Sequence, residues 1–422
     1  MRVIVVGGGV LGTMHAWQAV RRGHEVTHLE RELEGRGASV RNFGLVWVSG
    51  RASGAELKEA LRARELWEEI GAEVPGVGFR GNGSLTVCRT EAEVAVAEAA
   101  VTADEGRGFT LLEPHEARRV NPALRGEFRA ALHCARDGAV ESRVVVPHLR
   151  ARLQDSGGYT WLPGREVRDV VSGSVRDDHG RTHEGDQIVL ATGAALGGLV
   201  RELAPDLPVR RVRLQMAQTE PLGEPLTTSV ADGDSFRYYP AFRGPALDAL
   251  VAGQPQEEIA AADRMQLLMV QRLDGGLTIG DTHAYDEPFA FDLREAPYDH
   301  VTGVVSALLG RPAPRVVRRW AGVYAQCVDP SAVVLRRTVA DGVFLVTGPG
   351  GRGMTLSPAI AETSKKKNLT NLRSWMPFMT LFYWLNAIYS LSKKKKKRKR
   401  KKRRRRGWLP HYRKKCGERK VK

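Results

Sequence analysis

Lysine is almost missing from the first 363 residues, where Lys58 is the single lysine beside 40 arginines. Cysteine is also scarce, and the four cysteines form no C-x-x-C pair and no disulfide framework. This usage favours a reducing compartment, so we expect a cytoplasmic protein. The cysteines are Cys88, Cys134, Cys327 and Cys416. A strand predicted from residue 2 or 3 leaves no room for a signal peptide ahead of it.

Positive charge is unevenly distributed, although the formal net charge is +17. Residues 364–422, the tail, contain 24 of the 65 lysines and arginines and one acidic residue. Residues 1–363, the body, therefore carry 41 basic and 47 acidic side chains, a net charge of −6. The overall charge gives no reason to expect nucleic-acid binding by the body. The sequence also shows no metal-ligand spacing.

The chain opens with a predicted strand, helix and strand. Val3–Val6 is a continuous apolar run, mostly β-branched, as expected of a strand buried on both faces of a parallel sheet. Val10–Val20 is predicted to be a helix that ends near Gly23, and Glu25–Leu29 a second strand. This order is typical of a dinucleotide-binding α/β fold.

Three glycines between the first strand and the helix have G-x-G-x-x-G spacing. Gly7 permits the tight turn, Gly9 lets a pyrophosphate approach the backbone, and Gly12 lets the helix pack against the sheet. The helix N-terminus offers free N–H groups to the phosphates. Glu30 is placed to accept hydrogen bonds from a ribose hydroxyl. We therefore predict a dinucleotide site; the alternative is a glycine-rich turn without a ligand.

A second glycine-rich turn follows the apolar strand predicted at Val343–Val346 and precedes a helix from about Thr355. Its glycines are Gly348, Gly350, Gly351 and Gly353. Two helix N-termini can point at one elongated anionic ligand. A simple connector is the equally weighted alternative.

Between these turns we expect helices and further strands. The predicted helices are Ala55–Ile70, Glu91–Glu105, Leu112–Arg119, Val144–Gln154 and Asp299–Leu309, and the predicted strands include Gly83–Cys88, Arg165–Val171, Gln187–Ala191 and Val316–Tyr324. Gly138–Ser142 is predicted to be a turn. Four stretches alternate in polarity, which predicts an antiparallel sheet with one face covered. They are Val209–Glu220, Ser235–Pro240, Gln266–Arg272 and Leu277–Thr282.

The tail differs in composition from the body. An apolar stretch, Trp375–Leu391, precedes fourteen consecutive lysines and arginines, Lys393–Arg406. If the tail is native, it could contact anionic membranes or nucleic acid. We favour a non-native, disordered extension, because the usage switches abruptly from arginine to lysine. The native chain would then end one or two turns after Glu362.

Several motifs together resemble the D-amino-acid-oxidase-like family of FAD-dependent oxidoreductases, which includes glycine oxidase and sarcosine oxidase. The resemblance covers nearly all of the body. Besides the opening stretch it rests on GASVRNFG (Gly37–Gly44), VLATGA (Val189–Ala194), WAGVYAQCVD (Trp320–Asp329) and GPGGRGMTLSPAIAE (Gly348–Glu362). Within this family, two stretches resemble the sequences of a subgroup associated with phosphonate breakdown. They are SVRNFGLVWVSGR (Ser39–Arg51) and DGGLTIGDTHAY (Asp274–Tyr285).

The resemblance implies an α/β fold with two domains in the body. A discontinuous Rossmann-like FAD-binding domain would comprise residues 1–50, 145–205 and 325–363. A substrate-binding domain with an antiparallel sheet and helices would comprise 51–144 and 206–324. The tail, 364–422, would be a separate basic low-complexity segment.

The resemblance also implies where FAD binds. Gly7, Gly9 and Gly12 would hold the pyrophosphate, Glu30 the ribose, Ser39 and Arg41 to Gly44 the phosphates and flavin ring, and Val167 the adenine. Ala191 to Gly193 would line the cleft, and Gly350 to Thr355 would surround the ring, where the helix dipole stabilises negative charge. The full candidate set is Gly7, Gly9, Val10, Leu11, Gly12, Glu30, Arg31, Ser39, Asn42, Phe43, Gly44, Val167, Ala191, Thr192, Gly193, Gly350, Gly351, Arg352, Gly353, Met354 and Thr355.

Two departures from the family pattern concern the substrate and the cofactor link. Where amino-acid oxidases of this family often carry an arginine that grips the substrate carboxylate, this chain has Tyr324. A plain α-amino acid is therefore less expected. The sarcosine-oxidase branch tethers its flavin through a cysteine at about the position of Gly322, so FAD should be non-covalent here. Cys327 is expected to be a buried small residue.

The implied reaction transfers a hydride from the α-carbon of a free amine to flavin N5, and the imine then hydrolyses. The protein must exclude water and hold the anionic end of the substrate. A phosphonate favours arginine forks. The candidate catalytic residues are Arg41, Asn42, Arg237, Tyr239, His283, Tyr324 and Arg352. For each arginine a surface charge or structural salt bridge is the alternative, for His283 a core or turn position, and for Tyr239 a core aromatic.

The leading hypothesis is therefore an FAD-dependent oxidative deaminase for a small amine with an anionic group, an aminophosphonate, with O₂ or another carrier as electron acceptor. An ordinary D-amino-acid, glycine or sarcosine-type oxidase is the second hypothesis. The third is a basic-tailed membrane- or nucleic-acid-binding protein whose flavin fold is vestigial.

Overall fold

The computed structural model describes residues 1–374, with side chains up to residue 364. The chain divides into two compact units, Met1–Thr363 and Ser364–Lys422. The predicted apolar stretch and basic run of the tail lie outside the described residues.

A six-stranded sheet forms around the opening strand, with the order β18-β19-β12-β1-β2-β8. All neighbouring pairs are parallel except β18 with β19. The strands are β1 (Arg2–Val6), β2 (Glu25–Glu30), β8 (Tyr159–Pro163), β12 (Gln187–Leu190), β18 (Leu335–Ala340) and β19 (Val343–Thr347). Sequence reasoning located β1, β2, β12 and β19 and missed β8 and β18.

Both faces of this sheet are covered, as the apolar run in β1 predicts. Val3 and Val5 pack into a cluster with α1 (Val10–Arg21) and α5 (Val145–Gln154). Ile4 and Val6 pack on the opposite side with a three-stranded antiparallel sheet. That sheet comprises β9 (Val167–Val171), β10 (Ser174–Asp177) and β11 (Thr182–Glu184). Because both faces are buried, every residue of the strand interior is apolar.

An eight-stranded sheet has the order β17-β13-β16-β15-β14-β4-β6-β5 and is antiparallel except for β14 with β4. Its strands are β4 (Ser84–Cys88), β5 (Phe109–Leu112), β6 (Ala130–Cys134), β13 (Val209–Pro221), β14 (Ser229–Ala231), β15 (Leu268–Gln271), β16 (Gly276–Gly280) and β17 (Val316–Cys327). The antiparallel pairing is as predicted. The expectation that only one face is covered is wrong, because Leu268 and Met269 enter separate buried clusters on its two faces.

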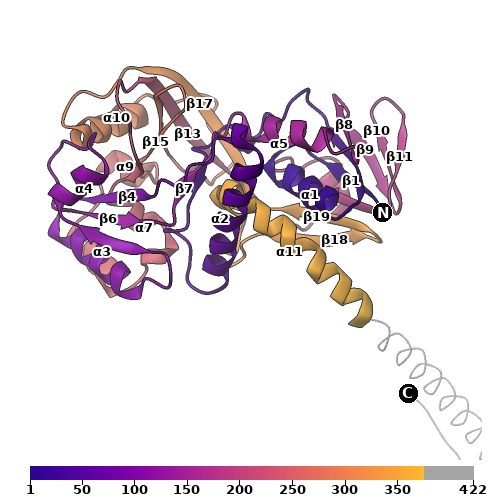
Figure 1. Ribbon diagram of the computed structural model, residues 1–422, viewed down its shortest axis with the longest axis horizontal. Coiled ribbons are helices and arrows are strands. Elements are labelled where there is room, and N and C mark those ends of the chain that lie inside the picture. The colour runs from indigo at the N-terminus through magenta and orange to yellow at the C-terminus, as the bar shows by residue number, and fades with distance from the viewer. Residues whose placement is uncertain (375–422) are drawn as a thin grey trace, which may run out of the picture. The chain divides into compact units, whose positions relative to one another are not determined.

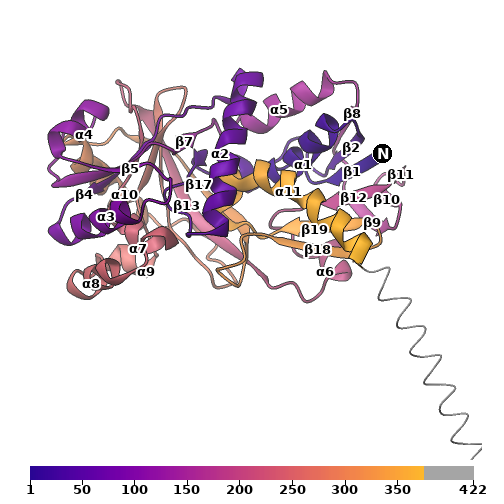
Figure 2. The same ribbon diagram turned by 60° about the horizontal axis from the view of Figure 1, so that its bottom comes forward.

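The remaining elements are mostly helices. They are α2 (Ala55–Glu73), α3 (Glu91–Ala103), α4 (Pro114–Val120), α6 (Leu199–Leu203), α7 (Asp234–Tyr238), α8 (Pro245–Gly253), α9 (Glu258–Ala262), α10 (Ala296–Leu309) and α11 (Gly353–Ser374). Figures 1 and 2 show α2 between the two large sheets. The mixed α/β fold class is confirmed. The strands of each large sheet come from the ranges predicted for one domain, except that β17 (Val316–Cys327) crosses the predicted boundary between residues 324 and 325. The division of the body into two domains stays a prediction.

Two local predictions are wrong. Ser235–Pro240 is not a strand: α7 is followed by a 3₁₀ turn, Pro240–Phe242. Phe236 is fully buried and meets Phe242 edge-on at 4.8 Å between ring centroids, so the tertiary packing of these rings overrides the alternating pattern. Gly138–Ser142 is not only a turn, because β7 (Gly138–Ala139) pairs with β3 (Leu45–Val46).

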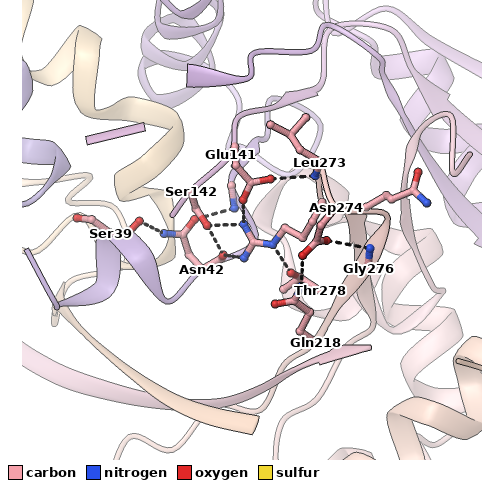
Figure 3. A network of polar contacts seen from close by, with 12 residues as sticks. Ser39, Asn42, Glu141, Ser142, Gln218, Leu273, Asp274, Gly276 and Thr278 are labelled. Carbon is pink, nitrogen blue, oxygen red and sulfur yellow. Dashed lines mark hydrogen bonds and ion pairs between the residues drawn. The ribbon is translucent and has the colours of Figure 1, made fainter. Parts of the chain in front are cut away.

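A buried guanidinium connects the eight-stranded sheet to the loop that follows residue 37. Arg272, just after β15, donates to Glu141 Oε1 at 2.5 Å, Ser142 Oγ at 2.8 Å, Thr278 Oγ1 at 2.6 Å and the Asn42 carbonyl at 3.3 Å (Figure 3). Arg272 and Glu141 are both buried. The ion pair therefore fixes segments that are far apart in the sequence.

The side chain of Asn42 holds its own loop in place through hydrogen bonds. Its side-chain amide donates to the carbonyls of Ala38 and Ser39 at 2.8 and 2.9 Å, and its Oδ1 accepts from the Gly44 N–H at 2.7 Å. The side chain thus closes a turn on both sides of itself. Asn42, a candidate catalytic residue, is a loop-shaping residue in this geometry.

We predict that Arg272→Met destabilises the protein by about 3–5 kcal/mol, because it leaves the Glu141 carboxylate buried without its partner. The double variant Arg272→Met/Glu141→Leu should lose less, because the uncompensated charge is gone. Chemical denaturation of both variants and of Glu141→Leu measures the coupling.

The exposed pair Arg125–Glu224 is the matched control. Arg125→Met should destabilise the protein far less than Arg272→Met does, because solvent screens this pair. Equal losses of stability in Arg272→Met and Arg125→Met would contradict a structural role for the buried pair.

Candidate active site

A cavity of about 1470 Å³ is lined by residues from both large sheets and their loops. Ligand pockets of drug-sized molecules measure roughly 300–1,000 Å³. The wall includes Gly7 and Val10 from the opening motif and Tyr324 and His283 from the region of the eight-stranded sheet. This cavity can therefore hold an elongated ligand together with a small second molecule.

The glycine loop is shaped by close backbone contacts. A Cβ on Gly7, at φ +108°, would lie 2.4 Å from the Ala191 carbonyl oxygen, and one on Gly12 would lie 2.0 Å from the Gly7 carbonyl oxygen. Neither position tolerates a side chain. Gly9 precedes α1, and the nearest atom to its added Cβ is Ser39 Oγ at 3.1 Å. The loop therefore exposes backbone, not side chains, at the start of α1.

Ser39 and Glu30 complete this part of the wall. Ser39 Oγ accepts a hydrogen bond from the Val10 N–H at 2.9 Å, which satisfies one free donor of α1. Glu30, at the end of β2, accepts from the Gly8 N–H at 2.5 Å and the Glu32 N–H at 3.0 Å. Its carboxylate is thereby fixed where the cavity wall begins.

A buried histidine supports the loop from behind. His28 Nε2 lies 2.9 Å from the Gly7 carbonyl oxygen, and Nδ1 lies 2.8 Å from the Tyr159 hydroxyl. Because a carbonyl oxygen only accepts, Nε2 carries the proton and Nδ1 accepts from Tyr159. Burial lowers the pKa of His28 to about 4, so the ring is neutral. Sequence reasoning missed His28, although a histidine inside a buried strand was a usable signal.

These features fit the FAD that the resemblance implies. The cavity is large enough, the glycine loop leaves backbone open at a helix N-terminus, and a carboxylate stands at the end of the second strand. Most cofactor candidates line the cavity: Gly7, Gly9, Val10, Leu11, Glu30, Arg31, Ser39, Asn42, Phe43, Val167, Ala191, Thr192, Gly193, Gly350, Gly351, Arg352, Gly353, Met354 and Thr355. Gly12 and Gly44 lie behind the wall, and all these roles stay predictions.

Two arginines and one carboxylate form a buried cluster on the same wall, the Arg51–Glu56–Arg352 cluster. Arg352 donates to Glu56 Oε2 at 3.2 Å, and Arg51 NH1 lies 3.7 Å from Glu56 Oε1. All three side chains are buried and line the cavity. Burial lowers the pKa of Arg51, and the charge of Glu56 opposes that shift. Two guanidinium groups share one carboxylate, so the cluster keeps one excess positive charge.

Tyr239 lies beside this cluster. The guanidinium carbon of Arg51 lies 5.7 Å from the centroid of the Tyr239 ring, within the range of a cation–π contact. Gln266 Nε2 lies 3.5 Å from the Tyr239 hydroxyl, and burial raises the pKa of Tyr239 above its ordinary value. Both residues line the cavity. Tyr239 therefore connects the arginine cluster with a second group of polar side chains.

This second group comprises Asp281, His283 and Tyr324 with Gln266. His283 Nδ1 donates to the Arg264 carbonyl at 3.0 Å, and its Nε2 lies 3.8 Å from Asp281 Oδ2. Burial raises the pKa of Asp281, and the neighbouring His283 partly offsets that rise. Burial also raises the pKa of Tyr324. The structure thus brings together His283, Tyr239 and Tyr324 as the sequence candidates suggest.

The two remaining arginine candidates differ in placement. Arg41 is exposed, lines the cavity, and donates to the Ala321 carbonyl at 3.0 Å. Arg237 does not line the cavity; it lies on α7, pairs with Asp234 at 3.1 Å and donates to the Gln254 carbonyl. The segment predicted as the strand Ser235–Pro240 is helical at Arg237, which places this candidate outside the cavity wall.

Sequence reasoning missed Arg51, Glu56, Gln266 and Asp281. Arg51 closes the SVRNFGLVWVSGR motif, so its place in that motif was an available signal. Asp281 follows β16 directly, and polar residues at strand ends often line sites. The pairing of Glu56 with Arg352 joins positions 296 apart and has no signal in one sequence.

We predict that acid weakens the fold through His28 and through His15, a second buried histidine whose pKa burial lowers to about 4. Both folded pKa values lie below the ordinary 6.5, so the unfolded chain takes up protons first. Stability is fully present above pH 6.5 and falls as the pH drops from 6.5 towards 4, by roughly 3 kcal/mol per histidine. Denaturation at pH 7, 6 and 5 measures the slope.

His28→Gln should reduce this acid slope, because glutamine does not titrate. His115→Gln is the control, since His115 is exposed and its side chain is 65% accessible. If stability falls with pH as steeply in His28→Gln as in the wild type, His28 does not contribute to the acid destabilisation.

The chain is similar to known proteins over most of its length. The family described as FAD dependent oxidoreductase (DAO) matches residues 2–364. Glycine oxidase of Geobacillus kaustophilus is 24% identical over 376 residues, covering 84% of this chain and 89% of the relative. D-amino-acid oxidase of Streptomyces coelicolor is 30% identical over 270 residues, covering 62% and 74%. D-amino acid dehydrogenase of Neisseria meningitidis is 23% identical over 426 residues, covering 86% and 94%.

Solved structures show the same fold. The crystal structure of glycine oxidase from Geobacillus kaustophilus superposes with a TM-score of 0.68 at 21% identity, covering 85% of this chain and 92% of that one. Iminodiacetate oxidase from Chelativorans sp. BNC1 gives a TM-score of 0.67 at 18% identity, covering 86% and 94%. Within the described residues, no helix has the length and apolar character needed to cross a membrane. The chain is a DAO-family enzyme, an FAD-dependent oxidoreductase.

Proposed function

We propose that the enzyme oxidises the C–N bond of a small amine that bears an anionic group, and that this group is a phosphonate. N-methylated 2-aminoethylphosphonate is the substrate we test first. The relatives named above include oxidases of glycine, D-amino acids and iminodiacetate, which supports an amine substrate. FAD is held without a covalent bond in this proposal. No described cysteine lines the cavity.

The Arg51–Glu56–Arg352 cluster is the observation that supports an anionic group on the substrate. Its excess positive charge lies on a buried part of the cavity wall, where a bound anion is poorly screened by solvent. The Arg51 Nε donates to the Trp47 carbonyl at 2.8 Å, which fixes the direction of the guanidinium plane. A fixed guanidinium pairs well with the several oxygens of a phosphonate.

Tyr324 supports the phosphonate over the carboxylate. It occupies the position where an arginine would grip an α-carboxylate, it is buried, and it lines the cavity. A phenol supplies one hydrogen bond and no charge, so this position offers no fork for a carboxylate. The guanidinium groups that line the described wall lie elsewhere, among them Arg41, Arg51 and Arg352.

Bound FAD supplies a two-electron acceptor for the hydride that leaves the carbon next to the substrate nitrogen. The residues of this chain orient the substrate: the arginine cluster holds its anionic end, and the aromatic side chains Tyr238, Tyr239 and Tyr324 exclude water. The imine product hydrolyses after it leaves the cavity. O₂ or another carrier then reoxidises the enzyme.

An ordinary D-amino-acid or glycine oxidase is the alternative, favoured by the 30% identity to D-amino-acid oxidase. An absorbance spectrum of the purified protein before and after anaerobic addition of N-methyl-2-aminoethylphosphonate separates the two. Loss of the visible flavin absorbance with this compound supports the proposal. Loss with glycine or sarcosine alone supports the alternative.

We predict that Arg51→Met raises KM for the aminophosphonate by about 10- to 100-fold, because a charged hydrogen bond contributes about 1.5–3 kcal/mol. The KM of Arg51→Lys should lie between those of the wild type and Arg51→Met, since lysine keeps the positive charge but lacks the two-pronged guanidinium. Steady-state kinetics with FAD-loaded enzyme measures both.

Arg237→Met is the matched control, because Arg237 is a largely buried arginine outside the cavity. Its KM should stay within about twofold of the wild type. Equal effects in Arg51→Met and Arg237→Met would refute the arginine cluster as the anion site.

A further inference from the structure

Five buried polar atoms on the cavity wall have no hydrogen-bond partner among the described residues: Trp47 Nε1, Glu56 Oε1, Asp281 Oδ1, Gln266 Oε1 and the Tyr324 hydroxyl. The last three belong to the second group of polar side chains described above. Their residues are 6%, 3% and 8% exposed, and all three line the cavity. A buried polar group without a partner costs about 1–3 kcal/mol, so this group is expected to meet a ligand.

The chemistry of these atoms defines that ligand. An ionised carboxylate and an amide oxygen only accept hydrogen bonds, so they require a ligand with N–H or O–H donors. The amide nitrogen of Gln266 lies 3.5 Å from the Tyr239 hydroxyl, and the Gln266 side chain is also a hydrogen-bonding neighbour of the Asp281 carboxyl. A positively charged ammonium group satisfies both acceptors and compensates the buried carboxylate.

We propose that Asp281 and Gln266 bind the substrate nitrogen as an ammonium and that Asp281 removes one of its protons before oxidation. The inference rests on the proposed function, because it places the nitrogen of that substrate. The N–H bond breaks, its electron pair stays on nitrogen as the free amine, and an O–H bond forms on Asp281. No electron leaves the substrate in this step. The free amine is the form that releases hydride from its α-carbon.

His283 is the positioning partner of Asp281. Its Nε2 lies 3.8 Å from Asp281 Oδ2, and its Nδ1 is held by the Arg264 carbonyl, so the ring is oriented toward the carboxylate. Stacking against Tyr238 at 4.4 Å between centroids fixes the ring. Burial raises the pKa of Asp281, which suits a group that must accept a proton.

The groups whose charges act on Asp281, or on which Asp281 acts, belong to several elements. They are His283, Tyr238, Tyr239, Tyr285 and Tyr324, and the guanidinium groups of Arg210 and Arg264 stand over the Tyr285 ring at 4.2 and 4.9 Å. Burial raises the pKa of each of these tyrosines. They therefore stay neutral in the range where the Asp281 carboxyl titrates.

The two binding groups imply a substrate with separated charges. The Arg51–Glu56–Arg352 cluster takes the anion, Asp281 and Gln266 take the cation, and Tyr239 contacts Arg51 with its ring and Gln266 with its hydroxyl. A zwitterion that spans one tyrosine side chain fits this arrangement. An uncharged amine or a plain anion satisfies only one half of it.

The experiment measures kcat/KM for N-methyl-2-aminoethylphosphonate from pH 6 to 10 in the FAD-loaded enzyme. Asp281→Asn should lower kcat/KM about 100-fold at pH 7, and the deficit should shrink about tenfold per pH unit as the free amine becomes abundant in solution. Ethylphosphonate, which lacks the nitrogen, should inhibit Asp281→Asn with an unchanged Ki and Arg51→Met with a raised Ki.

Asp263→Asn is the matched control, since Asp263 also has a buried carboxylate oxygen without a hydrogen-bond partner but does not line the cavity. It should keep the wild-type pH profile. If Asp281→Asn does not fold, Gln266→Leu serves instead and should raise KM for the amine without changing Ki for ethylphosphonate. The inference is overturned if Asp281→Asn keeps the wild-type dependence of kcat/KM on pH. It is also overturned if Gln266→Leu leaves KM for the amine unchanged.

Failure of the proposed function has a different signature. If the flavin of the wild-type enzyme is reduced by none of the aminophosphonate, glycine and sarcosine, the substrate class itself is wrong. If glycine or sarcosine reduces it, the same pH comparison on that amine still tests Asp281.

Discussion

The buried guanidinium of Arg272 holds the two walls of the cavity together. Arg272 directly follows β15 of the eight-stranded sheet. Its partners Glu141 and Ser142 lie shortly after β7, and Asn42 lies in the loop that also contains Ser39. Asn42 in turn shapes the turn that contains Ser39, whose hydroxyl caps the first free N–H of α1. One ion pair and a short series of hydrogen bonds thus relate the substrate side of the cavity to its dinucleotide side.

The cavity wall has two parts that differ in chemistry. The glycine loop, Glu30 and the neutral His28 are explained by backbone contacts and suit a dinucleotide regardless of the second substrate. In the proposed function, the arginine cluster and Asp281 face the substrate, and their charges select the molecule that is oxidised. One fold can host different substrates when residues of this second kind differ.

Local patterns predicted much of the fold, because buried parallel strands and amphipathic helices leave their period in the sequence. The opening strand–glycine–helix unit and the second glycine turn were found in this way. The strand predicted around Phe236 was wrong, because the packing of aromatic rings in the folded protein determines the backbone conformation there. A motif named Arg352, which lines the cavity, whereas its partner Glu56, Asp281 and Gln266 come together there only through the tertiary fold.

Gly322 shows how the packing of this enzyme limits its evolution. A Cβ at this position would lie 3.0 Å from the Leu214 side chain and 3.2 Å from the Arg41 carbonyl oxygen, tighter than most such contacts. A cysteine there, as in the sarcosine-oxidase branch that the motifs resemble, would require the Leu214 side chain or the Arg41 backbone to shift by a few tenths of an ångström. A covalently linked cofactor would therefore require a small repacking of this corner in addition to the thiol.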